Sequence, residues 1–228
     1  MPELVSLGLP GDEKAWTALG FTVDEHRRMP VGAVSCVVGM PPSWGFDELR
    51  GDASELGVPE LLSENAAAAA GPEQRLEQLL EHMSDDPSGA DLTAALGVSS
   101  PHPNGVTFVD HIVYLVHDLD ESVAALADVL GMPPRRRFHP RGPSGPEMAF
   151  YRVGEAFIEV VAARRPPALI GIAFGTPDLD ATVAAVRAAG GPIGDPKPAV
   201  QGGRIASVWN GHIDWGIAFM EPPVGSGS

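Results

Sequence analysis

A hairpin expected between residues 148 and 161 carries the first side chains that could do chemistry. With Gly-Glu at its turn, strand alternation places Arg152 opposite Phe157 and one diagonal step from Glu159. An arginine in this place could anchor a carboxylate or phosphate of a ligand through its planar guanidinium. It could also be the counter-ion of Glu159, and the short separation favours this second interpretation.

A second hairpin, indicated by the Asn-Gly pair at residues 210–211, carries another polar group. A two-residue turn there places Trp209 opposite His212. It also places Ser207 opposite Asp214, on the same side of the sheet. These four residues are substrate-binding candidates. The same side carries small residues that would leave room for a ligand, namely Gly171, Ala173, Gly216 and Ala218. Equally, the space could be filled by bulky residues of the first hairpin, namely Met148, Phe150 and Phe157.

Two other groups of reactive side chains give weaker signals. The basic run at residues 135–137, followed by His139, has no phosphate-binding spacing and is typical of a solvated loop. Cys36 lies in an apolar, strand-like stretch without a basic neighbour, which indicates a buried, inert thiol. A single cysteine also excludes an internal disulfide and a multi-cysteine zinc site.

The elements that must position these residues occur twice. Residues 108–163 and 168–222 each read as an apolar strand, an Asp-Leu-Asp turn, a short helix and alternating strands. The nine residues that begin at Asp118 reappear at Asp178, and in both copies the turn supplies an N-cap and a glycine ends the helix. Such repetition predicts an α+β fold, in which paired βαβββ modules form a curved sheet that bears a cleft.

The first module resembles the vicinal oxygen chelate (VOC) superfamily. The resemblance rests on His111 in the opening strand, the Asp-Leu-Asp turn, Leu-Gly after the helix and the closing strand at 157–161. Residues 171–179 and the closing strand at 217–222 are similar to the partner module. The superfamily includes glyoxalase I, methylmalonyl-CoA epimerase, extradiol dioxygenases, fosfomycin-resistance enzymes and bleomycin-resistance proteins.

A narrower resemblance, to a glyoxalase-like group from actinobacteria, is carried by residues 101–106 together with 199–201 and 203–206. The likeness covers residues 101–222 and implies the fold more strongly than it implies an activity.

The resemblance also implies a ligand set. In the superfamily each module supplies one group from its first strand and one from its last, and four such groups hold a divalent metal. His111 and Glu159 occupy these positions in the first module, and they are therefore the catalytic and metal-binding candidates. Gly171 and Ala218 occupy them in the second, and neither side chain can coordinate a metal. A tightly held metal cofactor is thus disfavoured, and the alternative is that His111 and Glu159 bond to each other or to a neighbour.

The rest of the chain is harder to assign. Residues 1–58 could be a third, diverged βαβββ module, and residues 59–107 read as a helical segment and linker before the modules at 108–163 and 168–222. The formal charge is −15, and residues 1–100 carry most of it, with 5 Lys/Arg against 17 Asp/Glu. This acidity argues against nucleic acid and anionic membranes as partners.

We therefore expect a cytoplasmic, glyoxalase-like protein that binds a small organic molecule between its modules. As an enzyme it would be an isomerase or lyase, with His111 or Glu159 moving the proton, helped by Arg152 and by His212 with Asp214. The alternative is a non-catalytic, drug-sequestering protein of the bleomycin-resistance type. The sequence leaves a homodimer open.

Overall fold

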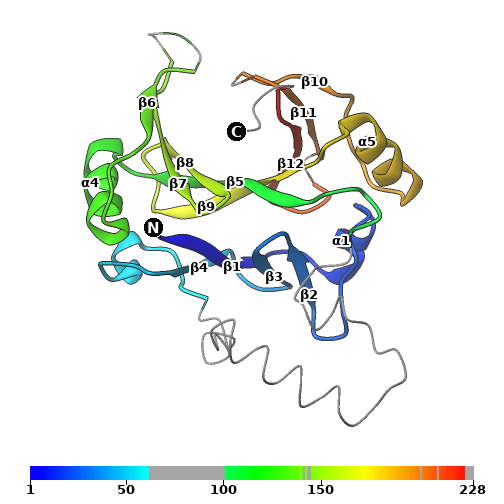
Figure 1. Ribbon diagram of the computed structural model, residues 1–228, viewed down its shortest axis with the longest axis horizontal. Coiled ribbons are helices and arrows are strands. Elements are labelled where there is room, and N and C mark those ends of the chain that lie inside the picture. Colours follow the sequence, from blue (N-terminus) through cyan, green and yellow to red (C-terminus); the bar gives the residue numbers. More distant parts are fainter. Residues whose placement is uncertain (62–100, 141, 143–144, 201, 210, 224–228) are drawn as a thin grey trace.

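The computed structural model describes residues 1–61, 101–140, 142, 145–200, 202–209 and 211–223. Within them the chain forms one eight-stranded and one four-stranded sheet. The large sheet is curved, with two arms that rise on the same side, and the small sheet lies beneath it (Figure 1). No helix of these described ranges is long and apolar enough to cross a membrane.

The first module supplies one arm of the large sheet. Its elements are β5 (Phe108–Val116), α4 (Leu119–Leu130), β6 (Arg136–Phe138), β7 (Met148–Val153) and β8 (Ala156–Ala162). Asp118 caps α4 by accepting a hydrogen bond from the Glu121 amide at 3.0 Å, and Gly131 ends the helix in the left-handed conformation. The Gly-Glu turn at 154–155 joins β7 to β8 as the sequence predicts, so Arg152 pairs with Phe157.

The second module supplies the other arm. Its elements are β9 (Ala168–Gly175), α5 (Leu179–Ala188), β10 (Lys197–Pro198), β11 (Arg204–Ser207) and β12 (Gly216–Glu221). Asp178 caps α5 through the Ala181 amide at 2.9 Å, in the same way as its counterpart caps α4. In both modules the first strand runs parallel to the last, so the prediction of paired βαβββ modules is confirmed.

Antiparallel pairing between β5 and β9 joins the two modules into one sheet of order β10-β11-β12-β9-β5-β8-β7-β6. The register shifts between Val109 and His111, which are paired with consecutive residues of β9. Asp110 is therefore the extra residue of a β-bulge, and Asp110 and His111 are both only partly buried where strict alternation would bury one of them.

The small sheet is built by β1 (Glu3–Leu9), β2 (Arg28–Val31), β3 (Val34–Val38) and β4 (Ser43–Asp47). Helix α1 (Glu13–Thr17) follows β1, and a short 3₁₀ helix, η1 (Ala53–Leu56), follows β4. The small sheet packs on the face of the large sheet that points away from the two arms (Figure 1), and the ring centroids of Trp44 and Tyr114 lie 5.0 Å apart there. The Tyr114 hydroxyl donates to the Leu56 carbonyl at 2.6 Å.

The proposal that residues 1–58 are a third module stays a prediction. Their element order is βαβββ, and β1 runs parallel to β3 as in the paired modules. However, β4 lies antiparallel on the other side of β1, in the position that the partner's first strand takes in the large sheet. Most of the helical segment expected within 59–107 lies outside the described residues.

The strand register expected from a two-residue turn at 210–211 is wrong, although the His212 amide does donate to the Trp209 carbonyl at 3.4 Å. Ser207 pairs with Ala218 rather than with Asp214, and residues 208–215 form a longer connection between β11 and β12. The connection follows tertiary contacts: His212 Nε2 donates to the Ala15 carbonyl of α1 at 2.8 Å, and Ile213 is buried.

A buried histidine fastens the start of the paired modules to the small sheet. His102 Nδ1 accepts the Thr22 amide at 3.1 Å, and its Nε2 donates to the Pro30 carbonyl at 2.9 Å. The bond from Thr22 needs the neutral ring, because a protonated Nδ1 cannot accept, whereas the bond to Pro30 can form in either state. Burial lowers the pKa of His102 from its ordinary 6.5, partly opposed by the bond to Pro30.

We predict that part of the stability of this protein depends on pH through His102. The lowered pKa means that the unfolded chain binds the proton more readily, so this stability is complete above pH 6.5 and is lost as the pH falls through the folded pKa. Urea unfolding at pH 7.5 and pH 5 should show that the free energy of unfolding falls less between these pH values in His102→Gln than in the parent. The exposed His26→Gln variant is the control, and an unchanged loss in His102→Gln would contradict the assignment.

Candidate functional site

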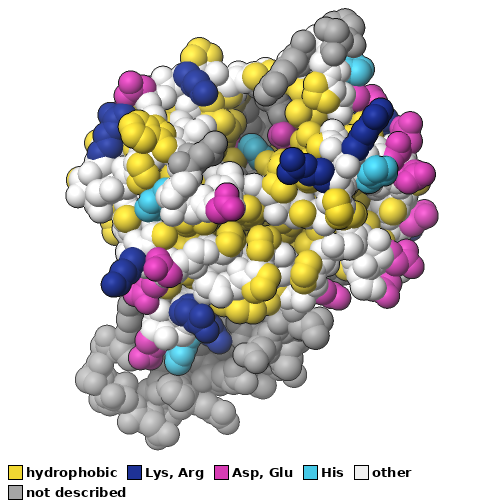
Figure 2. Space-filling view, turned by 180° about the vertical axis from the view of Figure 1, so that it is seen from behind, with side chains coloured by type: hydrophobic (Ala, Val, Ile, Leu, Met, Phe, Trp, Pro, Cys, Tyr) yellow, Lys and Arg dark blue, Asp and Glu magenta, His cyan; other side chains and the backbone are white. Residues whose placement is uncertain are grey.

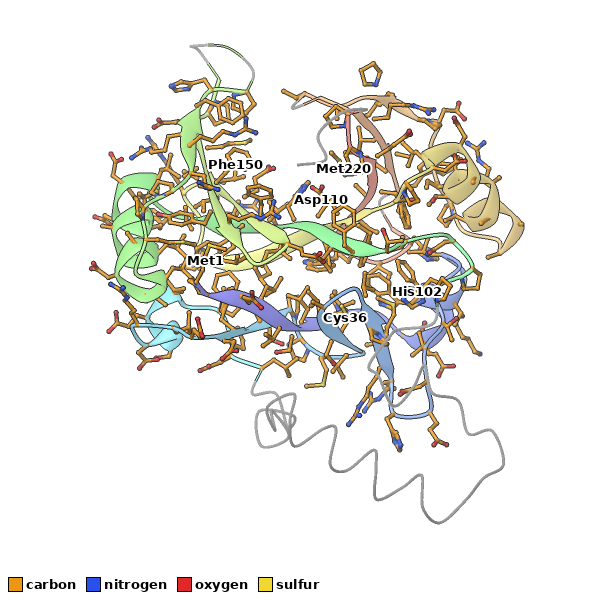
Figure 3. The ribbon with its side chains drawn as sticks, viewed as in Figure 1. Met1, Cys36, His102, Asp110, Phe150 and Met220 are labelled. Carbon is orange, nitrogen blue, oxygen red and sulfur yellow. The ribbon has the colours of Figure 1, made fainter. Side chains whose placement is uncertain are left out.

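A cavity of about 430 Å³ lies in the cleft between the two arms. Figure 3 shows Phe150 and Met220 on opposite arms, with Asp110 between them on the central strand. The apolar lining residues are Phe150, Phe157, Met220, Pro222 and Pro223. The polar ones are Asp110, His111, Arg135 and Arg136. In the space-filling view from behind, a hollow opens between the two upper arms (Figure 2). A volume of this size suits a small organic ligand.

A histidine between two carboxylates lies on the central strands of the cavity. His111 Nδ1 donates to Asp110 Oδ1 at 2.6 Å, and His111 Nε2 lies 3.8 Å from Glu159 Oε2. The bulge makes the first contact possible, since neighbouring residues of a regular strand point to opposite faces. The second arises because parallel β8 places Glu159 beside Val113, two residues along from His111. The sequence prediction paired His111 with Glu159 and missed Asp110.

Glu159 is the most perturbed acid of the site. Its side chain is only 17% exposed. Burial raises the pKa of Glu159; nearby His111 lowers it, and the negative charge of Asp110 raises it further. The site therefore combines a carboxyl group that holds its proton more strongly than usual with an imidazole oriented by a second carboxylate. Such a pair can give and take protons within one cavity.

Arg152 lies against the aromatic wall of the cavity rather than against Glu159. Its guanidinium carbon lies 4.7 Å from the centre of the Phe157 ring, and its Nε donates to the Gly154 carbonyl at 2.6 Å. The expected ion pair with Glu159 is not formed, because Glu159 contacts His111 instead. The geometry gives Arg152 the role of holding Phe157, and its contact with a ligand stays a prediction.

The four polar candidates of the second module are not gathered in the cleft. Ser207 pairs with Ala218, two register positions from the pair that Ile205 forms with Met220, and it is not among the residues that line the cavity. Trp209 is 65% exposed, and His212 is turned to α1 by its bond to Ala15. Asp214 is exposed in the same connection. Their substrate-binding role stays a prediction, and their placement outside the cavity lining does not support it.

The paired register supports the transfer of the metal-ligand positions between modules. His111 pairs with Phe157 and Glu159 follows two residues later; Gly171 pairs with Gly216 and Ala218 follows two residues later. Gly171 and Ala218 thus stand where His111 and Glu159 stand, and they offer no donor atoms. No group of three or more His, Cys, Asp or Glu suited to a metal ion occurs among the described residues. The residues present do not fit the four-ligand metal of the superfamily.

Two arginines of the basic run line the cavity, which the sequence prediction of a solvated loop missed. Arg135 donates its backbone amide to the Phe150 carbonyl at 2.7 Å, and Arg136 pairs with Phe150 in the sheet. The Arg136 guanidinium carbon lies 5.1 Å from the centre of the Phe150 ring. The three-residue strand β6 carries almost no pattern from which this pairing could have been predicted.

Comparisons with known proteins agree with this architecture. Residues 110–207 match the family model described as the Glyoxalase/Bleomycin resistance protein/Dioxygenase superfamily. The resemblance to the vicinal oxygen chelate superfamily is therefore confirmed over residues 110–207. No curated protein matches the chain.

Several solved structures are similar. Methylmalonyl-CoA epimerase from Mycobacterium tuberculosis is 24% identical, with 52% of this chain and 89% of that chain covered and a TM-score of 0.45. The Streptomyces coelicolor epimerase in complex with 2-nitronate-propionyl-CoA is 20% identical, with 54% and 99% covered and a TM-score of 0.46. A hypothetical protein from Bacillus halodurans C-125 is 18% identical, with 53% and 97% covered and a TM-score of 0.45.

We predict that the purified, dialysed protein retains well below one equivalent of any first-row transition metal. Two of the four positions that hold the metal in the superfamily carry Gly171 and Ala218, so the remaining imidazole and carboxylate would bind a divalent ion weakly. Elemental analysis of protein purified without a chelator checks this. One retained equivalent that disappears in His111→Gln would contradict it.

We also predict that Glu159→Gln raises the free energy of unfolding above that of the parent by more at pH 8 than at pH 4. The raised pKa of Glu159 means that its ionised form is disfavoured in the folded state. This cost is absent below the ordinary value of 4.5 and complete above the raised one, so a neutral isostere removes it only at the higher pH. Urea unfolding checks the difference, with Glu155→Gln in the exposed turn as control; an equal effect at both pH values would contradict the assignment.

Proposed function

We propose that this chain, whose residues 110–207 carry a glyoxalase-type domain of that superfamily, binds a small organic molecule in its cleft and moves a proton on it, as an isomerase or lyase. One observation carries the proposal: His111 lies between Asp110 and Glu159 on a cavity of about 430 Å³ with largely apolar walls. Partly buried clusters of titratable groups in such a cavity are typical of acid–base sites.

Each of the three residues has a distinct role in the proposal. Asp110 accepts a hydrogen bond from the Nδ1–H of His111 and so fixes the orientation of the ring. The neutral ring then presents Nε2, as a base, on the side where Glu159 lies. Glu159, whose pKa is raised by burial, is suited to return a proton as the acid. An isomerase needs both steps, and a lyase uses the acid on the leaving group.

The sequestering alternative is favoured by a different observation. Phe150 and Phe157 give the cavity an aromatic wall, and each ring has an arginine against it, Arg136 and Arg152 respectively. Such a wall holds a flat apolar molecule without any chemistry. The two functions differ in one measurable property: only the enzyme exchanges a carbon-bound proton of its ligand with solvent.

We predict that the protein catalyses deuterium incorporation from D₂O into at least one compound of a panel with an acidic C–H beside a carbonyl. The panel would contain α-hydroxyketones, 2-oxo acids and acyl thioesters, including methylmalonyl-CoA, which is named with the similar structures. His111→Gln and Glu159→Gln should each slow the exchange by about 10²-fold or more, because each removes a general acid or base.

Mass spectrometry of the recovered compounds measures the exchange. His117→Gln, at the exposed end of β5, is the matched control and should exchange at the parent rate. A compound that binds in the cleft of the parent protein but takes up no deuterium would support sequestration. Exchange that persists unchanged in both His111→Gln and Glu159→Gln would refute the proposed roles.

A further inference from the structure

We infer that the cleft selects an anionic ligand with a flat apolar body, and that Arg135 and Arg136 hold its carboxylate or phosphate. This inference rests on the proposed function, since it names the class of molecule that the same cavity accepts. The carrying observation is that two consecutive arginines line a cavity whose other walls are mainly aromatic and aliphatic.

The three arginines of the basic run have different partners. Arg137 forms ion pairs with Asp120 and Glu147, both at 2.7 Å, so its charge is matched within the first module. The Arg135 guanidinium forms no ion pair with a carboxylate of the described residues, and its residue lines the cavity. In a chain of formal charge −15, an arginine at a cavity that forms no ion pair with a described carboxylate is suited to bind the anionic group of a ligand.

The backbone holds the arginine pair in place. The backbone of Arg135 is fixed by the hydrogen bond from its amide N–H to the Phe150 carbonyl, and that of Arg136 by its pairing with Phe150 in the sheet. The Arg136 guanidinium also lies 4.6 Å from the Phe138 ring centre, so it is stacked on the aromatic wall. A guanidinium held in this way loses little freedom when it binds a planar anion.

The charges of the cavity also orient the ligand. Asp110 lies on the central strand β5 at the cavity, and its carboxylate repels the anionic group of a ligand. The anionic group of the ligand therefore belongs at the arginine side, on β6 and the residue before it. The uncharged, oxygenated part then lies toward His111, where the proton is moved. The flat body in between packs against Phe157 and, across the cleft, against Met220.

Matched probes that differ only in charge test this inference. Isothermal titration calorimetry would compare 3-phenylpropanoate, 2-phenylethylphosphonate and the neutral 3-phenylpropanamide on the full chain. The parent should bind at least one anion about tenfold or more tightly than the amide, because an ionic hydrogen bond is stronger than a neutral one. The better of the two anions identifies carboxylate or phosphate as the natural group.

The variant Arg135→Gln/Arg136→Gln should lose that tenfold preference while it binds the amide within about twofold of the parent. Arg136→Lys with Arg135 intact should keep a preference for the anion, which separates charge from stacking. Arg165→Gln, exposed and outside the cavity, is the matched control. Thermal unfolding of each variant monitors the fold.

Three outcomes would overturn the inference: equal affinity of the parent for anion and amide, no binding of any probe at millimolar concentration, or an anion preference that survives in Arg135→Gln/Arg136→Gln. Failure of the proposed function is distinguishable from these. Anion-selective binding that depends on the arginines, without any proton exchange by His111, leaves this inference standing and assigns the cleft to sequestration.

Discussion

The antiparallel pairing of β5 with β9 is the contact on which the rest of the structure depends. It converts two separate modules into one eight-stranded sheet, and the curvature of that sheet creates the cleft. The bulge within this pairing turns Asp110 to the side of His111, and a hydrogen bond of 2.6 Å follows. A regular strand would place Asp110 on the opposite face, where the small sheet packs. The irregularity of the central ladder thus assembles the polar part of the site.

The two modules contribute unequally to this cleft. The first supplies the titratable residues, the arginines and the aromatic rings, whereas the second supplies space and aliphatic surface. The reason lies in the backbone of the second module. A Cβ at Gly171 would come within 2.9 Å of the Gly216 carbonyl oxygen, so even an alanine would force β12 to shift. A histidine equivalent to His111 therefore does not fit there, and close packing of β9 on β12 accounts for the missing donor.

The sequence predicted the features that depend on local signals. The repeat, the caps at Asp118 and Asp178, and the Gly-Glu turn all follow from residue types at fixed spacing, and they suffice for the paired modules. The connection at 208–215 could not be predicted in this way. Its path is set by the bond from His212 to Ala15, which is distant in the sequence. The His212 amide still donates to the Trp209 carbonyl at 3.4 Å across the Asn-Gly pair, but the strands on either side do not pair in the register that this turn predicts.

The candidate site could be predicted from the sequence only in part. His111 and Glu159 follow from the resemblance to the superfamily, which implies one functional group in the first strand and one in the last strand of each module. Asp110 does not, because a bulge is a property of two paired strands rather than of one. The position of Arg135 and Arg136 depends on how β6 aligns with Phe150, and a three-residue edge strand gives almost no pattern from which that alignment could be read.

The central claim is that Asp110 orients His111 for proton transfer to a ligand in the cleft, and ring ¹⁵N NMR of the histidines tests it most directly. In the neutral ring of His111 the account predicts a protonated Nδ1 and an unprotonated Nε2, and the Nε2 signal should move when 3-phenylpropanoate is added. The signals of His102, buried beneath the sheet, should stay in place and serve as the internal reference. A neutral His111 protonated on Nε2, or a ring whose signals do not respond to a bound ligand, would contradict the account.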